Sequence, residues 1–230
     1  MYRKNNFANS MHLYDHIFSH DPFYVNEMKK KGAKNVSYLP LATDPGQYRN
    51  IEVSEEEQSQ YDFDVCFVGA PFHNRIKILD SLCEFKLGVF GDGWGIWHRL
   101  KFRKIPEYYK GKASGEKVLK LYKSSKIVLN IHGPEAKEGV NTRTFDIPMC
   151  GAFELTDYKP EMDKLFKPGE EIVYYKNIDE LKSLVRFYLN NPEKRKVIIA
   201  KGKERVLNSH TWNHRMQEVV NLLEKLFEGE

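Results

Sequence analysis

The sequence predicts a doubly wound α/β fold, in which helices cover both faces of one parallel sheet. From Tyr61 onward, short apolar runs of strand length alternate with amphipathic segments of helical length. The strand-like runs are apolar throughout instead of alternating with polar residues, which is typical of strands buried on both faces. Hydrophobic residues make up 41% of the 230 residues and aromatic residues 13%, so the chain can bury a substantial core.

The first segment of the chain, Leu13 to Pro40, reads as strand, helix and strand. Its helix opens at Asp21-Pro22 and closes at Gly32, and a β run, NVSYLPL, follows. Thr43 to Gln60 comes next and is polar, with a Pro-Gly pair, an acidic run and no sustained apolar period. We therefore expect one βαβ unit followed by a linker.

The remaining chain carries the main sheet. The expected strands are DVCFVG, LGVFG, KIVLNIH, AFELT and EIVYY. The expected helices are NRIKILDSLCEF, GEKVLKLYKSS, about 141–150, IDELKSLVRFYLNN, PEKRKVIIAKGKERVLNS and TWNHRMQEVVNLLEKLF. This predicts three parts: an N-terminal unit with its junction at 1–50, a sheet domain at 61–209 and a closing helix at 210–230.

Charge and composition bound the function only loosely. Lys and Arg (36) exceed Asp and Glu (32) to give +4, which suits an anionic small ligand and falls short of a dedicated nucleic-acid binder. No apolar run approaches the roughly 18 residues of a membrane span, and the start MYRKNNFANS lacks a secretory apolar segment. We expect a cytoplasmic protein whose three cysteines are reduced structural thiols.

Ligands of such sheets bind in loops at the carboxyl ends of the strands. The loop after the first strand of the sheet contains Gly69, where backbone can approach a ligand, and Arg75, whose planar fork suits a diphosphate. A tight turn with a solvated arginine is an equally good interpretation of this loop. It lacks the GxGxxG and GxxxxGK[ST] patterns, so NAD enzymes and ordinary NTPases are disfavoured.

A second loop, EGVNTRTFD, leads into a short helix. Asn141 is a good N-cap, which predicts a helix N-terminus aimed at the strand ends. Glu138 then lies in the loop, Arg143 near the helix start and Asp146 about one turn in; such carboxylates hold sugar hydroxyls, and an arginine holds phosphate. The alternative is a solvent-facing loop with a capped helix. Pro148 should kink the helix.

With Glu138 and Asp146, the chain reproduces the E-x7-E pattern of GT-B glycosyltransferases, with Asp in the second place. The longer succession of segments is more specific: YDFDVCFVGAPFHNR, VFGDGW, LYKSSKIVLNIH, GVNTRTFDIPMCGAFELTDY, LFKPGEEIVYYKNIDELKSLVRFYLNNPEKR and SHTWNHR. It resembles the group 1 glycosyltransferase-like domain of CgeB-like spore-maturation proteins and their bacterial relatives, over about Tyr61 to Leu226. The resemblance implies a Rossmann-like domain, the C-terminal half of the GT-B fold, that binds a nucleotide-diphosphate sugar.

From the resemblance, Arg75 and Arg143 would contact the donor diphosphate, with Asn141 in the same region. Asp146 would contact the ribose and Glu138 the sugar, which makes Glu138 the candidate catalytic residue. Asp in place of Glu at 146 shortens the side chain by one methylene. The resemblance implies metal-independent transfer, with the nucleotide sugar as co-substrate and no other cofactor.

In GT-B enzymes the acceptor site lies on an N-terminal domain, of which only the last strand-helix-strand is expected here. The resemblance therefore implies a partner chain or self-association, with apolar surface exposed on the closing helix. The acceptor is unknown. A rival interpretation is a non-catalytic nucleotide-sugar-binding or assembly module that kept the fold and lost turnover.

Three further patterns have ordinary explanations. Asp62 and Asp64 spell DxD, the metal-binding pattern of another glycosyltransferase fold, but they precede a strand, away from the expected site. His12, His16 and His20 recur every four residues in a segment that reads as strand, so a zinc site is not favoured. The basic stretch 98–117 fits single-stranded nucleic acid, an anionic ligand near the site or a solvated face.

Overall fold

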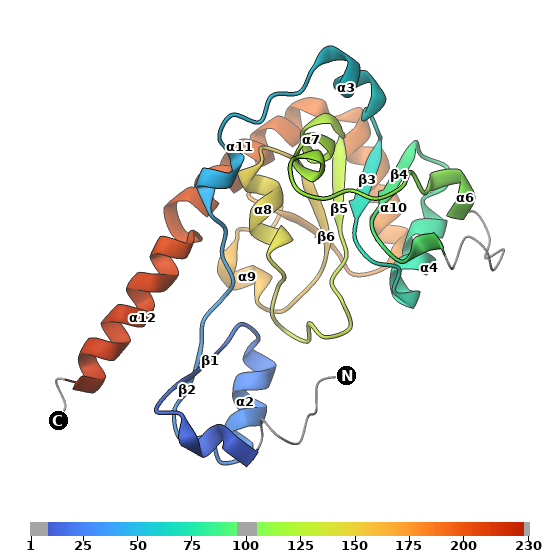
Figure 1. The fold of residues 1–230 in the computed structure, drawn as a ribbon. Helices are drawn as coiled ribbons and strands as arrows, with labels where there is room; N and C mark the ends of the chain where they lie inside the picture. The colour runs from blue at the N-terminus through green and yellow to red at the C-terminus, as the bar shows by residue number, and fades with distance from the viewer. Residues whose placement is uncertain (1–8, 96–104, 228–230) are drawn as a thin grey trace.

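The structure is a computed structural model that describes residues 9–95 and 105–227 (Figure 1). A five-stranded parallel sheet with helices on both faces forms the larger part. A smaller N-terminal unit, defined here as residues 9–42, lies at one end of it (Figure 1). Its elements are η1 (Met11–Leu13), β1 (Ile17–Ser19), α2 (Pro22–Lys30) and β2 (Val36–Tyr38).

The N-terminal unit confirms the expected βαβ arrangement. β1 and β2 pair in parallel, and α2 begins where the Asp21 carboxylate accepts the Phe23 N–H, with Pro22 at the first helical position. Gly32, with φ of 89°, reverses the chain after the helix. A small core holds the unit together: Met11, Val25, Ala33 and Val36.

The segment interpreted as a linker or domain junction, Thr43 to Gln60, contains two helices. They are η2 (Pro45–Tyr48) and α3 (Glu55–Gln60). The acidic run forms α3 because Ser54 and Glu57 make reciprocal capping bonds, and Glu57 also pairs with Lys120 at 2.8 Å. Helix formation here depends on capping and on contact with α7, neither of which appears as an apolar period.

The main sheet has the strand order β4-β3-β5-β6-β7, all parallel. Its strands are β3 (Val65–Val68), β4 (Leu87–Phe90), β5 (Ile127–Asn130), β6 (Glu154–Asp157) and β7 (Val173–Tyr175). The connections run outward in both directions from β3, so the order reverses between β3 and β5. This is the predicted doubly wound α/β fold.

Alternate residues of each strand face opposite layers of helices. Val65, Phe67 and Val89 pack with α4, α10 and α11 on one face, whereas Cys66 and Val128 face α7 and α8 (Figure 1). The helices are α4 (His73–Ser81), α6 (Ile105–Tyr108), α7 (Glu116–Ser124), α8 (Arg143–Met149), α9 (Met162–Leu165), α10 (Ile178–Asn190), α11 (Pro192–Ser209) and α12 (Trp212–Phe227).

α8 starts later than expected and without the expected cap. Its N-cap residue is Thr142, which makes no side-chain capping bond, and Asn141 pairs instead with the fully buried side chain of Asn130. A buried amide must be satisfied by hydrogen bonds, and Asn130 takes the side chain that would have capped the helix. Pro148 lies inside α8, and Gly151, with φ of 78°, follows its end.

α12 begins where the chain meets its own early part. Thr43 and Thr211 form a parallel bridge, in which the Thr43 N–H donates to His210 O and the Trp212 N–H donates to Thr43 O. The buried Arg215 donates to the Pro40 carbonyl at 2.9 Å. No helix in the described part of the chain is long and apolar enough to cross a membrane.

Candidate functional site

A cleft of about 460 Å³ opens at the carboxyl ends of β3 and β4. In doubly wound sheets, the crevice beside the reversal of strand order is where ligands bind. Residues from both strand-end loops, from the connecting segment and from α7 and α8 line it: Gln47, Tyr48, Val68, Gly69, Ala70, Gly91, Asp92, Ala113, Gly115, Val118, Leu119, Tyr122, Arg143 and Asp146. The cleft thus contains Gly69, Arg143 and Asp146 of the residues predicted from the sequence.

The floor of the cleft is built from two closely packed strand-end loops. At Gly91, φ is 139° and a Cβ would lie 2.4 Å from the Gly69 carbonyl oxygen, so only glycine fits there. The Gly69 carbonyl also accepts the indole N–H of the fully buried Trp94 at 2.8 Å. Gly69 and Gly91 both line the cleft, so backbone borders it where the sequence predicted close approach to a ligand.

Arg75 links the loop after β3 to the loop after β5. Its Nε and Nη2 donate to Ile131 O at 3.1 and 2.7 Å, and its Nη1 donates to Ala70 O at 3.1 Å. The residue is 3% exposed, and burial lowers its pKa to about 10. The structure therefore gives Arg75 a supporting role between the β3 and β5 loops, and it is absent from the cleft lining.

Arg143, the first residue of α8, is fixed at one end of its guanidinium. Its Nε donates to the Asn130 side-chain oxygen at 3.1 Å, and among the described residues no other side chain accepts from it. A guanidinium carries five N–H groups, so most of the Arg143 fork is available to an acceptor in the cleft. This planar arrangement suits the oxygens of a phosphate group.

Asn130 is the centre of the network behind Arg143. Its oxygen accepts from Asn141 as well as Arg143, and its amide donates to Asn141, Thr144 and Glu154. Asn141 therefore acts through Asn130 and is not part of the cleft lining. Asn130 was not predicted from the sequence, although an amide at the end of the otherwise apolar run KIVLN was a usable signal.

Glu154 is a buried carboxyl at the base of this network. Its Oε1 accepts from Asn130 at 2.9 Å, while its Oε2 is buried and has no hydrogen-bond partner among residues 9–95 and 105–227. Burial raises its pKa to about 8, which means that the group is largely protonated at neutral pH.

Asp146 faces the cleft one turn into α8. Its Oδ1 accepts hydrogen bonds from the hydroxyls of Thr43 and Tyr48, each at 2.6 Å. Partial burial raises its pKa, and the two hydroxyl bonds act in the opposite direction. Both hydroxyls come from the segment interpreted as a linker. They were not predicted from the sequence, because no local pattern connects residues about 100 positions apart.

Glu138 lies on the loop between β5 and α8, against the N-terminal unit. Its N–H donates to both carboxylate oxygens of Asp21 at 3.3 Å, and its carbonyl accepts from the Glu161 N–H at 3.2 Å. At Gly139 a Cβ would lie 2.5 Å from His20 O, so the next residue must be glycine for the loop to pack this closely. Glu138 is half-buried and is not among the cleft residues.

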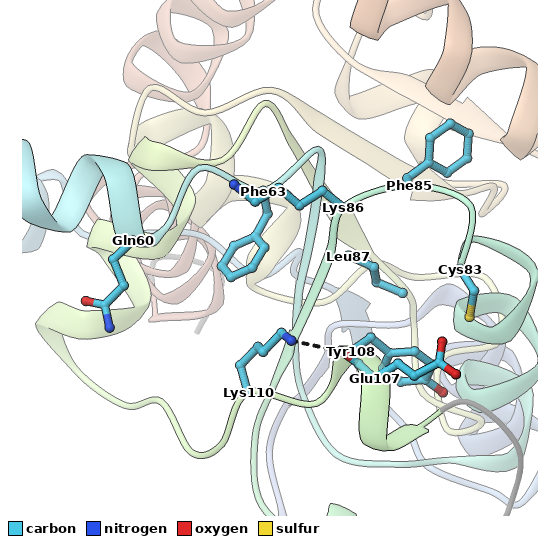
Figure 2. Close-up of a pocket in the computed structure, with 9 residues that line it drawn as sticks. All are labelled: Gln60, Phe63, Cys83, Phe85, Lys86, Leu87, Glu107, Tyr108 and Lys110. Atoms are coloured by element: carbon cyan, nitrogen blue, oxygen red, sulfur yellow. Dashed lines mark hydrogen bonds between the residues drawn. The ribbon is translucent and has the colours of Figure 1, made fainter.

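A second pocket of about 400 Å³ lies at the opposite, amino-terminal edge of the sheet, around Phe63 and Leu87 (Figure 2). Its lysines are engaged: Lys110 donates to Glu107 O at 2.8 Å, and Lys86 lies 3.7 Å from an Asp62 oxygen. Its position away from the strand-end loops separates it from the candidate site.

The DxD pattern and the basic stretch do not join the site. Asp62 and Asp64 both pair with Lys126, at 3.9 and 2.8 Å, beside the start of β3. Most of the first half of the basic stretch, 98–104, lies outside the described residues, so its three interpretations remain open. The histidine pattern does not form a helix face, because β1 occupies Ile17–Ser19.

Comparisons with known proteins identify relatives over most of the chain. The chain is 29% identical over 191 residues to the spore protein CgeB of Bacillus subtilis (strain 168), covering 76% of this chain and 57% of CgeB. It is also 30% identical over 153 residues to an uncharacterized protein of Aquifex aeolicus (strain VF5), covering 65% of this chain and 36% of that protein. The chain thus spans about half or less of the length of these relatives.

Solved structures of the same fold include sucrose-phosphate synthase from Thermosynechococcus elongatus, with a TM-score of 0.71 and 13% identity over 97% of this chain and 61% of that one. Anabaena Alr3699/HepE in complex with UDP-glucose also has a TM-score of 0.71, with 10% identity over 95% of this chain and 68% of that one. These likenesses show the Rossmann-like GT-B fold. The model of the family described as "glycosyl transferase-like" matches residues 74–221, and the chain belongs to this family.

Proposed function

We propose that this chain is the donor-binding part of a glycosyltransferase that takes a nucleotide-diphosphate sugar and transfers its glycosyl group to an acceptor. The observation that carries the proposal is the pairing of Arg143 and Asp146, one turn apart on α8, in a cleft floored by glycine-containing strand-end loops. The cation suits the diphosphate and the carboxylate suits the ribose hydroxyls. HepE, of the same fold, has been solved with UDP-glucose.

In this proposal Arg143 stabilises the charge that develops on the diphosphate as the sugar bond breaks, which supports transfer without a metal ion. Arg75 contributes by fixing the loops on either side of that charge. Glu138 is proposed to contact the sugar, and the contact of its loop with Asp21 of the N-terminal unit supports a role on the acceptor side. The acceptor and any general base are assigned to that other part, and a cytoplasmic location remains a prediction.

The first prediction concerns Arg143 and nucleotide binding. Titration calorimetry with UDP, GDP, ADP and TDP should find one family that binds the wild type, and Arg143→Gln should weaken that binding at least about tenfold, since a charge-assisted contact is lost. Binding of the matching nucleoside, which lacks phosphate, should change little. Arg186→Gln is the matched control, because Arg186 pairs with Glu84 on the surface away from the cleft.

Absence of binding by every nucleoside diphosphate at millimolar concentration would contradict the proposed function. The rival, a non-catalytic nucleotide-sugar-binding or assembly module, predicts the same binding. The two differ in turnover: an enzyme releases nucleoside diphosphate from the sugar conjugate when an acceptor extract is present, and a binding module does not.

A further inference from the structure

Two hydroxyl groups approach Asp146 from outside its own helix. Thr43 Oγ1 and Tyr48 OH each lie 2.6 Å from Asp146 Oδ1, and the two hydroxyl oxygens lie 3.0 Å apart. The short distances indicate that both protons are directed at the carboxylate. Oδ1 thereby accepts two hydrogen bonds. The Thr142 side chain also interacts with this carboxylate, whose two oxygens offer about four lone-pair sites and so leave room for a ligand hydroxyl.

The two hydroxyls differ in what they can reach. Thr43 is 2% exposed and does not line the cleft, whereas Tyr48 is half-buried and does. A hydroxyl that donates its proton still has lone pairs that accept hydrogen bonds. Tyr48 thus lines the cleft, and its oxygen, which keeps acceptor capacity, lies 2.6 Å from Asp146 Oδ1.

Tyr48 is held in place before any ligand arrives. It ends η2, a turn whose start is fixed by the Asp44 side chain accepting the Gly46 N–H. The Thr43–Thr211 bridge also fixes the chain just before η2, and the Tyr48 ring packs against the buried cluster that includes Ile147 and Cys150. A fixed acceptor binds a ligand without first losing conformational entropy.

We propose that Tyr48 and Asp146 together form the receptor for the two ribose hydroxyls of the donor nucleotide. The Tyr48 oxygen accepts one ribose hydroxyl and the second carboxylate oxygen of Asp146 accepts the other. In this arrangement the Tyr48 phenol compensates for the Asp146 side chain, which is one methylene shorter than the glutamate of the E-x7-E pattern. The inference rests on the proposed function and adds to it a residue of the connecting segment that selects ribose over deoxyribose.

The test measures selectivity for the 2′-hydroxyl. Using calorimetry, the nucleoside diphosphate that binds best among UDP, GDP and ADP is compared with its 2′-deoxy analogue on wild type, Tyr48→Phe and Thr43→Val. The wild type should prefer the ribonucleotide by roughly tenfold, the value of one well-placed hydrogen bond. Tyr48→Phe should lose most of that preference.

Thr43→Val is the matched control because it removes the other hydroxyl on Asp146 Oδ1 without altering the cleft wall. It should lower the affinities of both nucleotides in proportion and leave their ratio unchanged. If Tyr48→Phe acted only by disturbing the structure around Asp146, it too would leave the ratio of the two affinities unchanged. The ratio therefore distinguishes direct contact of Tyr48 with the ribose from support of Asp146.

A reciprocal pair of variants gives a second readout. Asp146→Glu in the wild type should weaken binding, since the longer side chain meets the Tyr48 hydroxyl. In the Tyr48→Phe background it should recover part of the lost 2′-hydroxyl preference. An unchanged preference in Tyr48→Phe, or a wild type that binds only TDP, overturns the inference and leaves the proposed function standing, whereas a wild type that binds no nucleoside diphosphate overturns both.

Discussion

Single buried groups set the electrostatics behind the cleft, and Glu154 is the clearest case. Its raised pKa means that the folded state keeps a proton between about pH 4.5 and pH 8 that the unfolded chain has lost. Unfolding is then favoured as pH rises, so Glu154 makes the protein less stable across this window. Below pH 4.5 both states are protonated and the effect vanishes.

Glu154→Gln should remove this pH dependence, because glutamine stays neutral and keeps an acceptor for Asn130. We expect the free energy of unfolding of the variant to exceed that of the wild type by a margin that grows by about 1 kcal/mol per pH unit between pH 5 and pH 8. Urea denaturation at both pH values measures it. Glu193→Gln, on the exposed surface, is the control; parallel curves for wild type and Glu154→Gln would refute the prediction.

At the level of elements, contacts with the N-terminal unit fix the conformation of the loop between β5 and α8. Asp21 caps α2 through Phe23 and at the same time accepts the Lys137 N–H at 2.8 Å and the Glu138 N–H. Tyr24 OH donates to the Glu135 carbonyl at 3.2 Å. The N-terminal unit and the loop that carries Glu138 are therefore joined through the buried Asp21 carboxylate and the Tyr24 hydroxyl.

Asp21→Asn should uncouple the N-terminal unit from the loop that carries Glu138 while keeping the cap of α2. One side-chain oxygen remains to accept the Phe23 N–H, and an NH₂ group replaces the other oxygen. We expect a loss of about 2 kcal/mol in the free energy of unfolding, and faster hydrogen exchange at the Glu138 amide. Asp44→Asn, which alters an exposed cap in η2, should cost less than about 0.5 kcal/mol. Equal costs for the two substitutions would argue against the coupling.

How far the sequence predicts this architecture depends on whether the determinant is local. The strands and long helices follow from apolar periodicity, and Gly69, Arg143 and Asp146 were placed at the cleft from their position after strands. Asn141 was misjudged as a cap because Asn130, 11 residues away, competes for it. Tyr48 and Thr43 were missed since their partner lies about 100 residues later, a relation that only the folded chain reveals.

At the scale of the whole molecule, α12 carries an apolar stripe on its surface. Trp212, Met216, Val220, Leu223 and Leu226 are 39 to 50% exposed, at spacings of three and four residues. Figure 1 shows the helix extending away from the sheet. The predicted self-association, or contact with a partner chain, has an apolar surface available to it here.

Val220→Lys with Leu223→Lys tests this surface. The free energy of unfolding should change by less than about 0.5 kcal/mol per site, because both side chains are substantially exposed. If the stripe mediates self-association, sedimentation equilibrium should show a larger mass for the wild type than for the double variant at the same concentration. A wild type that is monomeric at about 100 μM would remove self-association from consideration and leave a partner chain.

The Thr43–Thr211 bridge has a consequence for how such a chain can be recombined. The chain enters the sheet-bearing part at Thr43 and leaves it at Thr211, and these two residues pair with each other at one seam. The start and the end of that part are therefore adjacent. Exchange of the segment before the seam for another sequence would disturb this seam and the contacts of Asp21 and Tyr24 with the loop between β5 and α8, but no strand of the main sheet. Tyr48 and Asp146 meet beside the seam, so a recombined chain would have to keep both residues in the cleft to retain the proposed ribose site.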